Sequence, residues 1–324
     1  MSAQAAVGVD LGGTNLKVAL VDGKGKILGQ RTLAVEASGG PRRAVADACD
    51  AIDRLLAEQS LTCGDLVGVG IGAPGPISYR EARIIHAANL PGWQDVDLCT
   101  PVSKRLGTQV AFDNDGNAAA YGEYWAGAGR GTDGMVMLTL GTGVGAGVIL
   151  DGQILHGHFD NAGELGHMIV VPDGLPCACG QAGCLEQYAS ASAVARRVIA
   201  AVEAGEACVL STQVGGRSAV DARRVAEAAR GGDALCLRIW DEACLYLAVA
   251  CINIQHAYNP ECIVVGGGMS EAGAFLIDRV LEHSRRHRWC LHDDFPSVKL
   301  ASLGYHAGVV GAAGLAWTRF GEAK

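Results

Sequence analysis

Four residues that can bind a metal ion lie close together near the middle of the chain. His167 is followed within 18 residues by Cys177, Cys179 and Cys184. Three thiolates and one imidazole form a closed tetrahedral ligand set for zinc. The glycines between the last two cysteines would let a short loop wrap around an ion. A redox pair or a cluster of buried thiols is the alternative interpretation of the same residues.

Two acidic residues, Glu164 and Glu186, flank this set. A metal ion that holds the loop would keep both carboxylates near one another, which is typical of a built binding site. Because four protein ligands leave no open position on zinc, we expect the ion to be structural and not a Lewis acid.

Three strand ends finish in glycine-rich turns, two of which also carry a threonine hydroxyl. Consecutive glycine N–H groups form a nest for anions, and α/β sheets place their ligands at strand ends. The chain contains no G-x-x-x-x-G-K-[ST] sequence, and a strand follows the second turn where a dinucleotide fingerprint needs a helix. The turns therefore favour a nucleotide cleft between two related domains. Their residues are Asp10, Gly12, Gly13 and Thr14, then Gly141, Thr142 and Gly143, then Gly266, Gly267 and Gly268.

The first two turns belong to a repeated pattern. The segment V-G-V-D-L-G-G-T-N-L-K-V-A-L-V-D-G begins at Val7, and M-V-M-L-T-L-G-T-G-V-G-A-G-V-I-L-D-G begins at Met135. Each contains an apolar strand, a Gly/Thr turn, a second apolar strand and Asp-Gly. The repeat indicates a duplicated domain, with two ordinary hairpins as the alternative.

A candidate base lies between a short strand at residues 109–112 and a helical run at residues 118–125. Asp115 stands at the expected helix start, where an aspartate commonly serves as the N-cap. It could also accept a hydroxyl proton during phosphoryl transfer. The neighbouring Asn114 and Asn117 suit hydrogen bonding to a polyol.

Length and composition limit the classes of protein to which this chain can belong. The chain has 324 residues, enough for about two domains, with 49% hydrophobic residues and a formal net charge of −8. The acidic balance argues against a general nucleic-acid surface, which needs clustered Lys and Arg. No apolar run reaches 18 residues and no signal peptide is apparent, so we expect a cytoplasmic protein that does not enter a membrane. The 12 cysteines fit reduced thiols, with Cys244 and Cys251 as core residues.

The remaining pattern is mixed α/β. Hairpins fill the first 35 residues, and helical spacing follows over residues 41–59. A further strand covers residues 66–71. The chain then reads as mostly helical over residues 185–257, as a strand over 261–265, and as helix from about 271 and again over 307–320.

Together these motifs resemble the ROK family (repressors, open reading frames, kinases) within the actin/hexokinase-like superfamily of ATPases, from about residue 7 to residue 317. Asp10-Leu-Gly-Gly-Thr-Asn and Leu140-Gly-Thr-Gly-Val-Gly-Ala-Gly resemble its two phosphate motifs, and Val264-Val-Gly-Gly-Gly-Met-Ser resembles its adenosine motif. Gly163-Glu-Leu-Gly-His, with Cys-x-Cys-Gly-x-x-Gly-Cys-Leu-Glu, resembles its zinc signature. Asn89-Leu-Pro-Gly-Trp resembles a sugar-contacting loop, and Asp113-Asn-Asp-Gly-Asn resembles the catalytic segment.

The resemblance implies a fold. We expect an α/β, two-domain actin-like ATPase (ribonuclease H-like) fold with duplicated mixed-sheet domains and a cleft between them. The smaller domain would comprise residues 1–114 plus 305–324. The larger, residues 115–304, would carry the zinc site.

It also implies an activity, that of an ATP-dependent sugar kinase with Mg²⁺ and a structural Zn²⁺. Asp115 would be the general base. Asp10 would help to position Mg²⁺, and Thr14 and Thr142 would lie by the phosphates, with Asn15 and Lys17 completing the first phosphate motif. His167 would give one ring nitrogen to zinc and the other to a sugar hydroxyl. The sugar ligands would be Gly75, Asn89, Asn114, Asp115, Glu164, His167 and Glu186.

Asp113 stands where the family often has Glu, and Gly116 where it often has Ala. Neither departure removes a reacting group.

Several alternatives stay open. Glucose is the leading hexose, but kinases of N-acetylmannosamine, N-acetylglucosamine, fructose and allose share these motifs. The family's repressors carry a DNA-binding helical domain ahead of the first strand, where about six residues stand here. A non-catalytic sugar-binding protein would be expected to lack the base or the phosphate glycines. By resemblance we expect a homodimer and no nucleic-acid partner.

Overall fold

The computed structural model describes the chain except for residues 1–4, 36–38, 88–89, 214–219, 290–293 and 322–324. Residue contacts divide it into two compact units. The first comprises residues 1–132, 147–163 and 302–324, and the second comprises residues 133–146 and 164–301. The helix α3, Asp115–Ala126, which we expected to open the second domain, belongs to the first unit.

The first sheet has the strand order β3-β2-β1-β4-β8. β1 pairs antiparallel with β2, and β2 with β3, while β1–β4 and β4–β8 are parallel. The hairpins predicted for the first 35 residues are therefore confirmed. The strands are β1 Ala5–Leu11, β2 Asn15–Asp22, β3 Ile27–Ala34, β4 Leu66–Ala73 and β8 Val110–Asn114.

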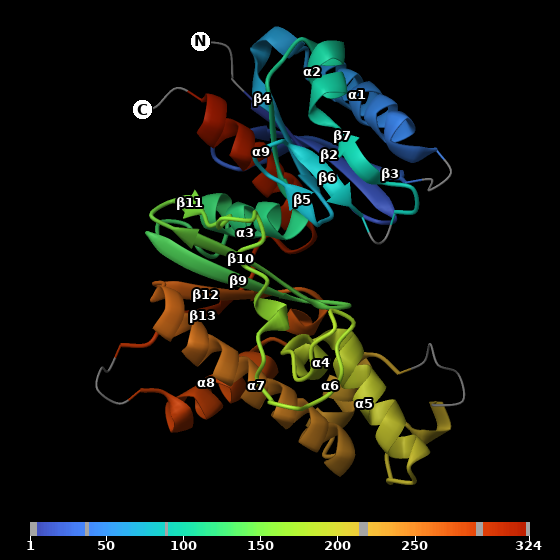
Figure 1. Cartoon of the computed structure of the whole chain (residues 1–324), viewed down its shortest axis with the longest axis vertical. Coiled ribbons are helices and arrows are strands. Elements are labelled where there is room, and N and C mark those ends of the chain that lie inside the picture. The colour runs from blue at the N-terminus through green and yellow to red at the C-terminus, as the bar shows by residue number, and fades with distance from the viewer. Residues whose placement is uncertain (1–4, 36–38, 88–89, 214–219, 290–293, 322–324) are drawn as a thin grey trace. The chain divides into compact units, whose positions relative to one another are not determined.

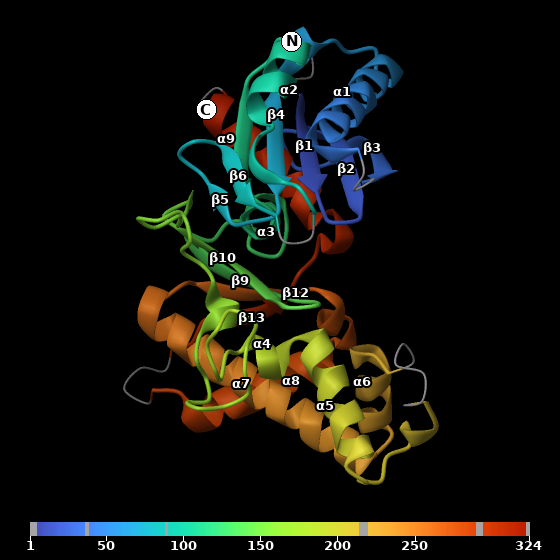
Figure 2. The same ribbon diagram turned by 45° about the vertical axis from the view of Figure 1, so that its right-hand side comes forward.

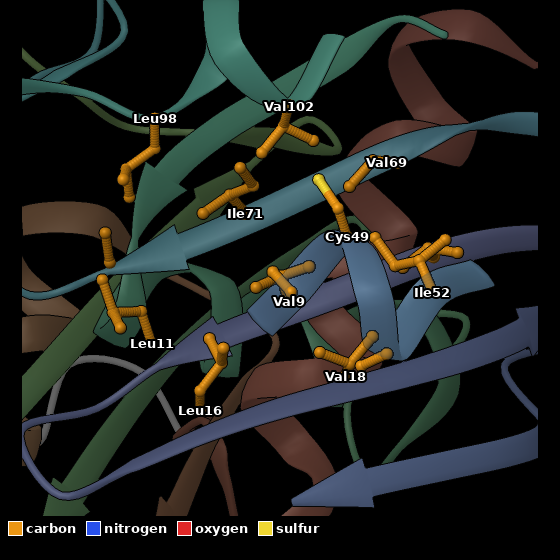
Figure 3. Packing of buried hydrophobic residues seen from close by; sticks show 14 of the residues in the cluster. Val9, Leu11, Leu16, Val18, Cys49, Ile52, Val69, Ile71, Leu98 and Val102 are labelled. Carbon is orange, nitrogen blue, oxygen red and sulfur yellow. The ribbon is translucent and has the colours of Figure 1, made fainter. Parts of the chain in front are cut away.

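The two faces of this sheet meet different partners. Alternate residues of a strand point to opposite faces, and Val7, Val9 and Leu11 of β1 join a buried cluster with α1, Gly40–Glu58, and α2, Cys99–Leu106. Figure 3 shows this packing around Val9, Ile52 and Val69. The opposite face of β1 carries Ala6 and Gly8 and meets the C-terminal helix α9, Ala307–Phe320.

The helix α9 lies so close to its neighbours that only glycine fits at the contacts. A Cβ atom added to Gly8 would lie 1.8 Å from the carbonyl oxygen of Val309, and one added to Gly70 of β4 would lie 1.7 Å from that of Ala312. On the side facing α3, a Cβ atom on Gly311 would lie 1.7 Å from the carbonyl oxygen of Ala118. In Figures 1 and 2 the red α9 runs between the blue strands and the green α3. The C-terminal helix is thus held by backbone contact on two sides.

A buried carboxylate fixes the segment that leads into α9. Glu123 of α3 is fully buried and accepts hydrogen bonds from the backbone N–H groups of Ala128 at 2.8 Å, Ser302 at 3.1 Å and Leu303 at 2.7 Å. These donors, with the Ser302 hydroxyl at 3.2 Å, replace the water that the carboxylate loses on burial.

The second sheet has the order β11-β10-β9-β12-β13. Numbered along the chain, the strands of both five-stranded sheets follow the order 3-2-1-4-5, so the duplication predicted from the repeat is confirmed in the topology. The parallel pairs β9–β12 and β12–β13 correspond to β1–β4 and β4–β8. The strands are β9 Gly134–Leu140, β10 Val144–Leu150, β11 Gln153–Ile154, β12 Cys262–Gly266 and β13 Ser297–Leu300.

The predicted helices of the second unit are present. They are α4 Glu186–Ala189, α5 Ala191–Glu203, α6 Ala222–Arg230, α7 Ala234–Tyr258 and α8 Ala274–His287. Cys244 and Cys251 of α7 are buried core residues, as expected. The helix expected from about residue 271 begins later, because a 3₁₀ turn, Gly268–Ala272, precedes it. In the part of the chain that the structure describes, no helix is long and apolar enough to cross a membrane.

A small sheet that the sequence analysis did not predict lies in the first unit. It has the order β5-β6-β7, with β5 Ile77–Ser78, β6 Arg83–His86 and β7 Gln94–Asp97. Its strands are two to four residues long, too short to show a period in the sequence.

Replacing Gly311 by Ala tests the backbone contact of α9. The added methyl group would overlap the Ala118 carbonyl, so we expect the free energy of unfolding to fall by about 3 kcal/mol or more, although alanine favours helices. Gly64→Ala is the control, because its Cβ atom would meet its nearest neighbour at an ordinary 3.6 Å. Equal denaturation midpoints for the two variants would refute the close contact.

Candidate active site

The predicted metal ligands converge in the second unit. One ligand atom each from His167, Cys177, Cys179 and Cys184 lies within 4.8 Å of the other three. The Nδ1 atom of His167 is 3.7 Å from Cys177 Sγ, and Cys179 Sγ is 3.6 Å from Cys184 Sγ. With Zn–S bonds of about 2.3 Å, the edge of a sulfur tetrahedron is about 3.8 Å. The donor set and its spacing therefore fit zinc.

Two glycines shape the loop around this cluster. Gly180 and Gly183 take φ angles of +91° and +84°, which residues with a side chain rarely adopt. A Cβ atom on Gly183 would lie 1.7 Å from the carbonyl oxygen of Val171. Backbone pairing of Ile169 with Cys184 and of Pro176 with Ala182 closes the loop.

The thiols of the cluster do not share one pKa. Burial opposes a charge on Cys177, but hydrogen bonds from the backbone and thiol of Cys179 and from the Gln187 amide lower its pKa to about 7. Burial and the neighbouring Cys179 and Cys177 raise the pKa of Cys184 to about 12. A cation must displace the remaining thiol protons, so metal binding weakens as the pH falls.

The loop that carries the four predicted metal ligands, residues 167–184, is called the metal loop here. It is joined to the second glycine turn. Glu186, the first residue of α4, follows Cys184 by two positions, and its Oε2 atom accepts a hydrogen bond of 3.0 Å from the backbone N–H of Val144. A Cβ atom on Gly143 would lie 2.1 Å from the same oxygen. On the other flank, a Cβ atom on Gly166 would lie 2.0 Å from the Val144 carbonyl oxygen. The cluster, Glu186 and this turn therefore form one connected structure.

Three side chains of this connected structure have atoms that could contact a ligand. His167 turns Nδ1 toward the cysteines, which leaves Nε2 for a second partner. Glu164 is exposed and immediately precedes the 3₁₀ turn Leu165–His167. Glu186 uses Oε2 for the glycine turn and retains Oε1.

The candidate base lies in the first unit at the junction of β8 and α3. Asn114, the last residue of β8, caps the helix, because its Oδ1 accepts from the N–H groups of Gly116 at 2.8 Å and Asn117 at 3.3 Å. The N-cap interpretation of Asp115 is therefore wrong by one residue. Asp115 is the first helical residue, where the helix dipole stabilises negative charge.

A buried network supports this junction. Asp113 is 1% exposed, and its Oδ1 accepts a hydrogen bond of 2.8 Å from the Asn117 side chain. Asn117 thus holds the junction, although its type had suggested a polyol contact. The Oδ2 atom of Asp113 is 2.7 Å from His156 Nε2, and the ring of Tyr79 stacks on His156 with centroids 3.6 Å apart. His156 belongs to no motif, so no sequence pattern predicted its role.

The first glycine turn is held by charge and by α9. Lys17 Nζ lies 3.2 Å from Asp10 Oδ2, donates to the carbonyl oxygen of Tyr305 at 3.1 Å and sits over the Tyr305 ring. A Cβ atom on Gly308 of α9 would lie 2.7 Å from the same oxygen of Asp10. Asp10 is therefore fixed at the end of β1, while the following residues Gly13, Thr14 and Asn15 are exposed.

The second turn is closed by a hydrogen bond from the Gly141 N–H to the Gly143 carbonyl, and Thr142 on it is exposed. The third turn lets β12 approach β9 closely. Gly267 has a φ angle of +82°, and a Cβ atom there would lie 2.5 Å from the carbonyl oxygen of Leu140.

A pocket of about 280 Å³ opens beside Gly268. Sequence motifs predicted only the side of the pocket that Gly268 forms. The helix α6 forms another side, but it carries no motif, and only the fold brings it near Gly268. The lining residues are Ala222, Arg223, Ala226, Glu227, Arg230, Trp240, Gly268, Met269, Glu271 and Ala272.

Two predicted sugar ligands remain. Gly75 lies close to Asn114, since a Cβ atom there would be 3.0 Å from Asn114 Nδ2. Asn89 lies outside the described residues.

Comparison with known proteins agrees with these features. Residues 6–319 match the ROK family. The chain belongs to the ROK family. It is 38% identical over 316 residues to a glucokinase of Halalkalibacterium halodurans, covering 97% of this chain and 96% of that protein. Both the family and the mixed α/β fold predicted from the sequence are thereby confirmed.

Two solved structures are similar along their whole length. A ROK hexokinase from Thermus thermophilus superposes with a TM-score of 0.84 at 31% identity, covering 97% of this chain and 98% of that one. A ROK family glucokinase from Streptomyces griseus, solved in complex with glucose and AMPPNP, gives a TM-score of 0.77 at 34% identity, covering 97% and 99%.

We expect Cys179→Ser to hold one zinc equivalent fewer than the wild type, because the hydroxyl is a poor substitute for thiolate. The affinity of this cluster for zinc should fall by at least about tenfold, and the melting temperature should fall with it. Lowering the pH should release the same equivalent from the wild type. Cys63→Ser, a half-buried cysteine outside the cluster, is the control. A Cys179→Ser protein with unchanged zinc content and melting would remove this residue from the ligand set.

Proposed function

We propose that this protein is an ATP-dependent hexose kinase that forms a sugar 6-phosphate, with glucose as the leading acceptor. One observation carries the proposal: the metal-ligand cluster, Glu186 and a glycine turn are joined by direct contacts in the second unit. A structural ion, a carboxylate suited to sugar hydroxyls and a backbone suited to phosphate therefore depend on one another. The similarity to a glucokinase along the whole chain supports this assignment.

The chemistry needs a base at the acceptor hydroxyl. Phosphoryl transfer proceeds through a loose transition state, so the protein mainly positions the reactants and stabilises charge. Asp115 would accept the hydroxyl proton as the oxygen attacks the γ-phosphorus. Its place on the first turn of α3, with Asn114 as the cap, keeps the carboxylate on a rigid element.

The sugar would be held by groups that differ in hydrogen-bonding character. Glu186 Oε1 and Glu164 can accept from hydroxyls, and the Asn114 Nδ2 group can donate, since its Oδ1 is committed to the helix cap. Nε2 of His167 would meet a further hydroxyl. Zinc, when bound by its four protein ligands, would fix the loop and take no part in catalysis.

The nucleotide would use all three glycine turns. Backbone N–H groups of the first two would bind the phosphates, and the pocket between the third turn and α6 has a size suited to the adenosine. Asp10 would orient Mg²⁺, which offsets charge on the β- and γ-phosphates. The AMPPNP bound to the Streptomyces griseus enzyme supports ATP as the donor here.

The decisive test is ADP release from Mg-ATP by zinc-replete protein across glucose, mannose, fructose, N-acetylglucosamine, N-acetylmannosamine and allose. We expect the highest kcat/KM with glucose. A higher value with an N-acetylated sugar would keep the kinase and change its substrate. No turnover with any of the six would contradict the proposal.

Asp115→Asn should lower kcat by about 10²–10⁴-fold, because the proton acceptor is lost while the fold is kept. Glucose affinity, measured by calorimetry, should change only a few-fold. Asp151→Asn is a matched control, since it makes the same change on an exposed turn of the first unit. Near-normal turnover by Asp115→Asn would exclude it as the base.

A further inference from the structure

A second group of metal-ligating side chains lies in the second unit, away from the zinc signature. One ligand atom each from Cys208, Asp233 and Cys236 lies within 4.8 Å of the other two. Cys208 follows α5, and Cys236 is in the first turn of α7. The proposed kinase reaction uses none of the three.

The spacing of the two sulfur atoms matches that of a bound metal. Cys208 Sγ and Cys236 Sγ are 3.6 Å apart, the same separation as between Cys179 and Cys184 in the first cluster. It is close to the tetrahedron edge of about 3.8 Å that Zn–S bonds require. Both cysteines are free in this structure, since a disulfide would need a separation of about 2.05 Å.

Asp233 is already fixed in position to complete the group. Its Oδ1 accepts from the N–H of Cys236 at 2.9 Å, and its Oδ2 from the N–H of Val209 at 2.7 Å. Burial opposes its charge, but these N–H groups and the thiols of Cys236 and Cys208 hydrogen-bond to the carboxylate and lower its pKa. Each carboxylate oxygen has a second lone pair, so one can bind a metal without releasing the backbone.

We propose that Cys208, Cys236 and Asp233 form a second binding site for a thiophilic divalent cation, with Zn²⁺ as its ion. Two thiolates select soft or borderline cations over Mg²⁺ and Ca²⁺. Binding releases the two thiol protons to solvent and leaves a fourth position for water. The site differs from the first cluster, in which the protein supplies all four ligands.

The ion would connect two ends of one chain segment. Cys208 precedes α6 and Cys236 follows it, and α6 lines the pocket beside Gly268. A cation here would hold both ends of the segment that carries α6. The inference does not depend on the proposed function, because the site is defined by its own residues and tested by metal content.

The test is the zinc content of the full-length protein after dialysis against metal-free buffer with a reductant. We expect two zinc equivalents per wild-type chain, one in Cys177→Ser, one in Cys236→Ala and none in the double variant. Cys244→Ala is the matched control, because it truncates another buried cysteine of α7 and should retain both. One equivalent in the wild type, or two in Cys236→Ala, would overturn the proposal.

A second variant separates metal binding from folding. Asn is as good an N-cap as Asp, so Asp233→Asn should keep α7 intact by circular dichroism while lowering the zinc affinity of this site at least about tenfold. In the Cys177→Ser background, Co²⁺ should give a sulfur-to-metal charge-transfer band that disappears with Cys208→Ala. Persistence of that band would contradict the assignment, as would a mass showing that Cys208 and Cys236 are joined in a disulfide in the purified protein.

Discussion

Direct backbone contact of the C-terminal helix with the first sheet is the constraint on which the first unit depends. Gly8 and Gly70 let α9 lie against β1 and β4, and Gly311 lets the same helix lie against α3. Both candidate chemical groups of this unit take their positions from it. Asp10 meets the start of α9 at Gly308, and Asp115 begins the helix that α9 contacts. The same helix thus positions both Asp10 and Asp115. Chemistry that needs groups placed within fractions of an ångström requires such a rigid support.

The second unit positions its candidate functional groups in a different way. Its metal loop contains few buried apolar side chains, so packing alone would hold it weakly, and the four ligand atoms offer a compact substitute. The loop in turn carries Glu186 against the Gly143–Val144 turn. A cation bound by these ligands would therefore also order Glu186 and the backbone of the Gly143–Val144 turn. In both units glycine allows a close contact. In the first unit the contact is between α9 and the strands, and in the second it is between the Glu186 carboxylate and the Gly143–Val144 turn.

Local patterns predicted the parts whose cause is local. Turn glycines, strand alternation and the spacing of His167 with its cysteines all depend on neighbours in sequence, and each is found where expected. The helix start at α3 was displaced by one residue, because Asn114 and Asp115 have similar cap preferences and only the backbone geometry separates them. The partnership of Asp113 with His156 and the contribution of α6 to a pocket arise from tertiary contacts between segments without motifs. No single-sequence pattern encodes such contacts.

The contact between Gly143 and Glu186 has a consequence for how such a protein could diverge. Any side chain at position 143 would occupy the space of the carboxylate, so a substitution there must turn the Glu186 side chain away and break its hydrogen bond to the Val144 N–H. Loss of the acid at position 186 would break the same hydrogen bond. The two changes therefore have overlapping effects, and the second should cost less stability than the first. A lineage that has changed one partner is freer to change the other.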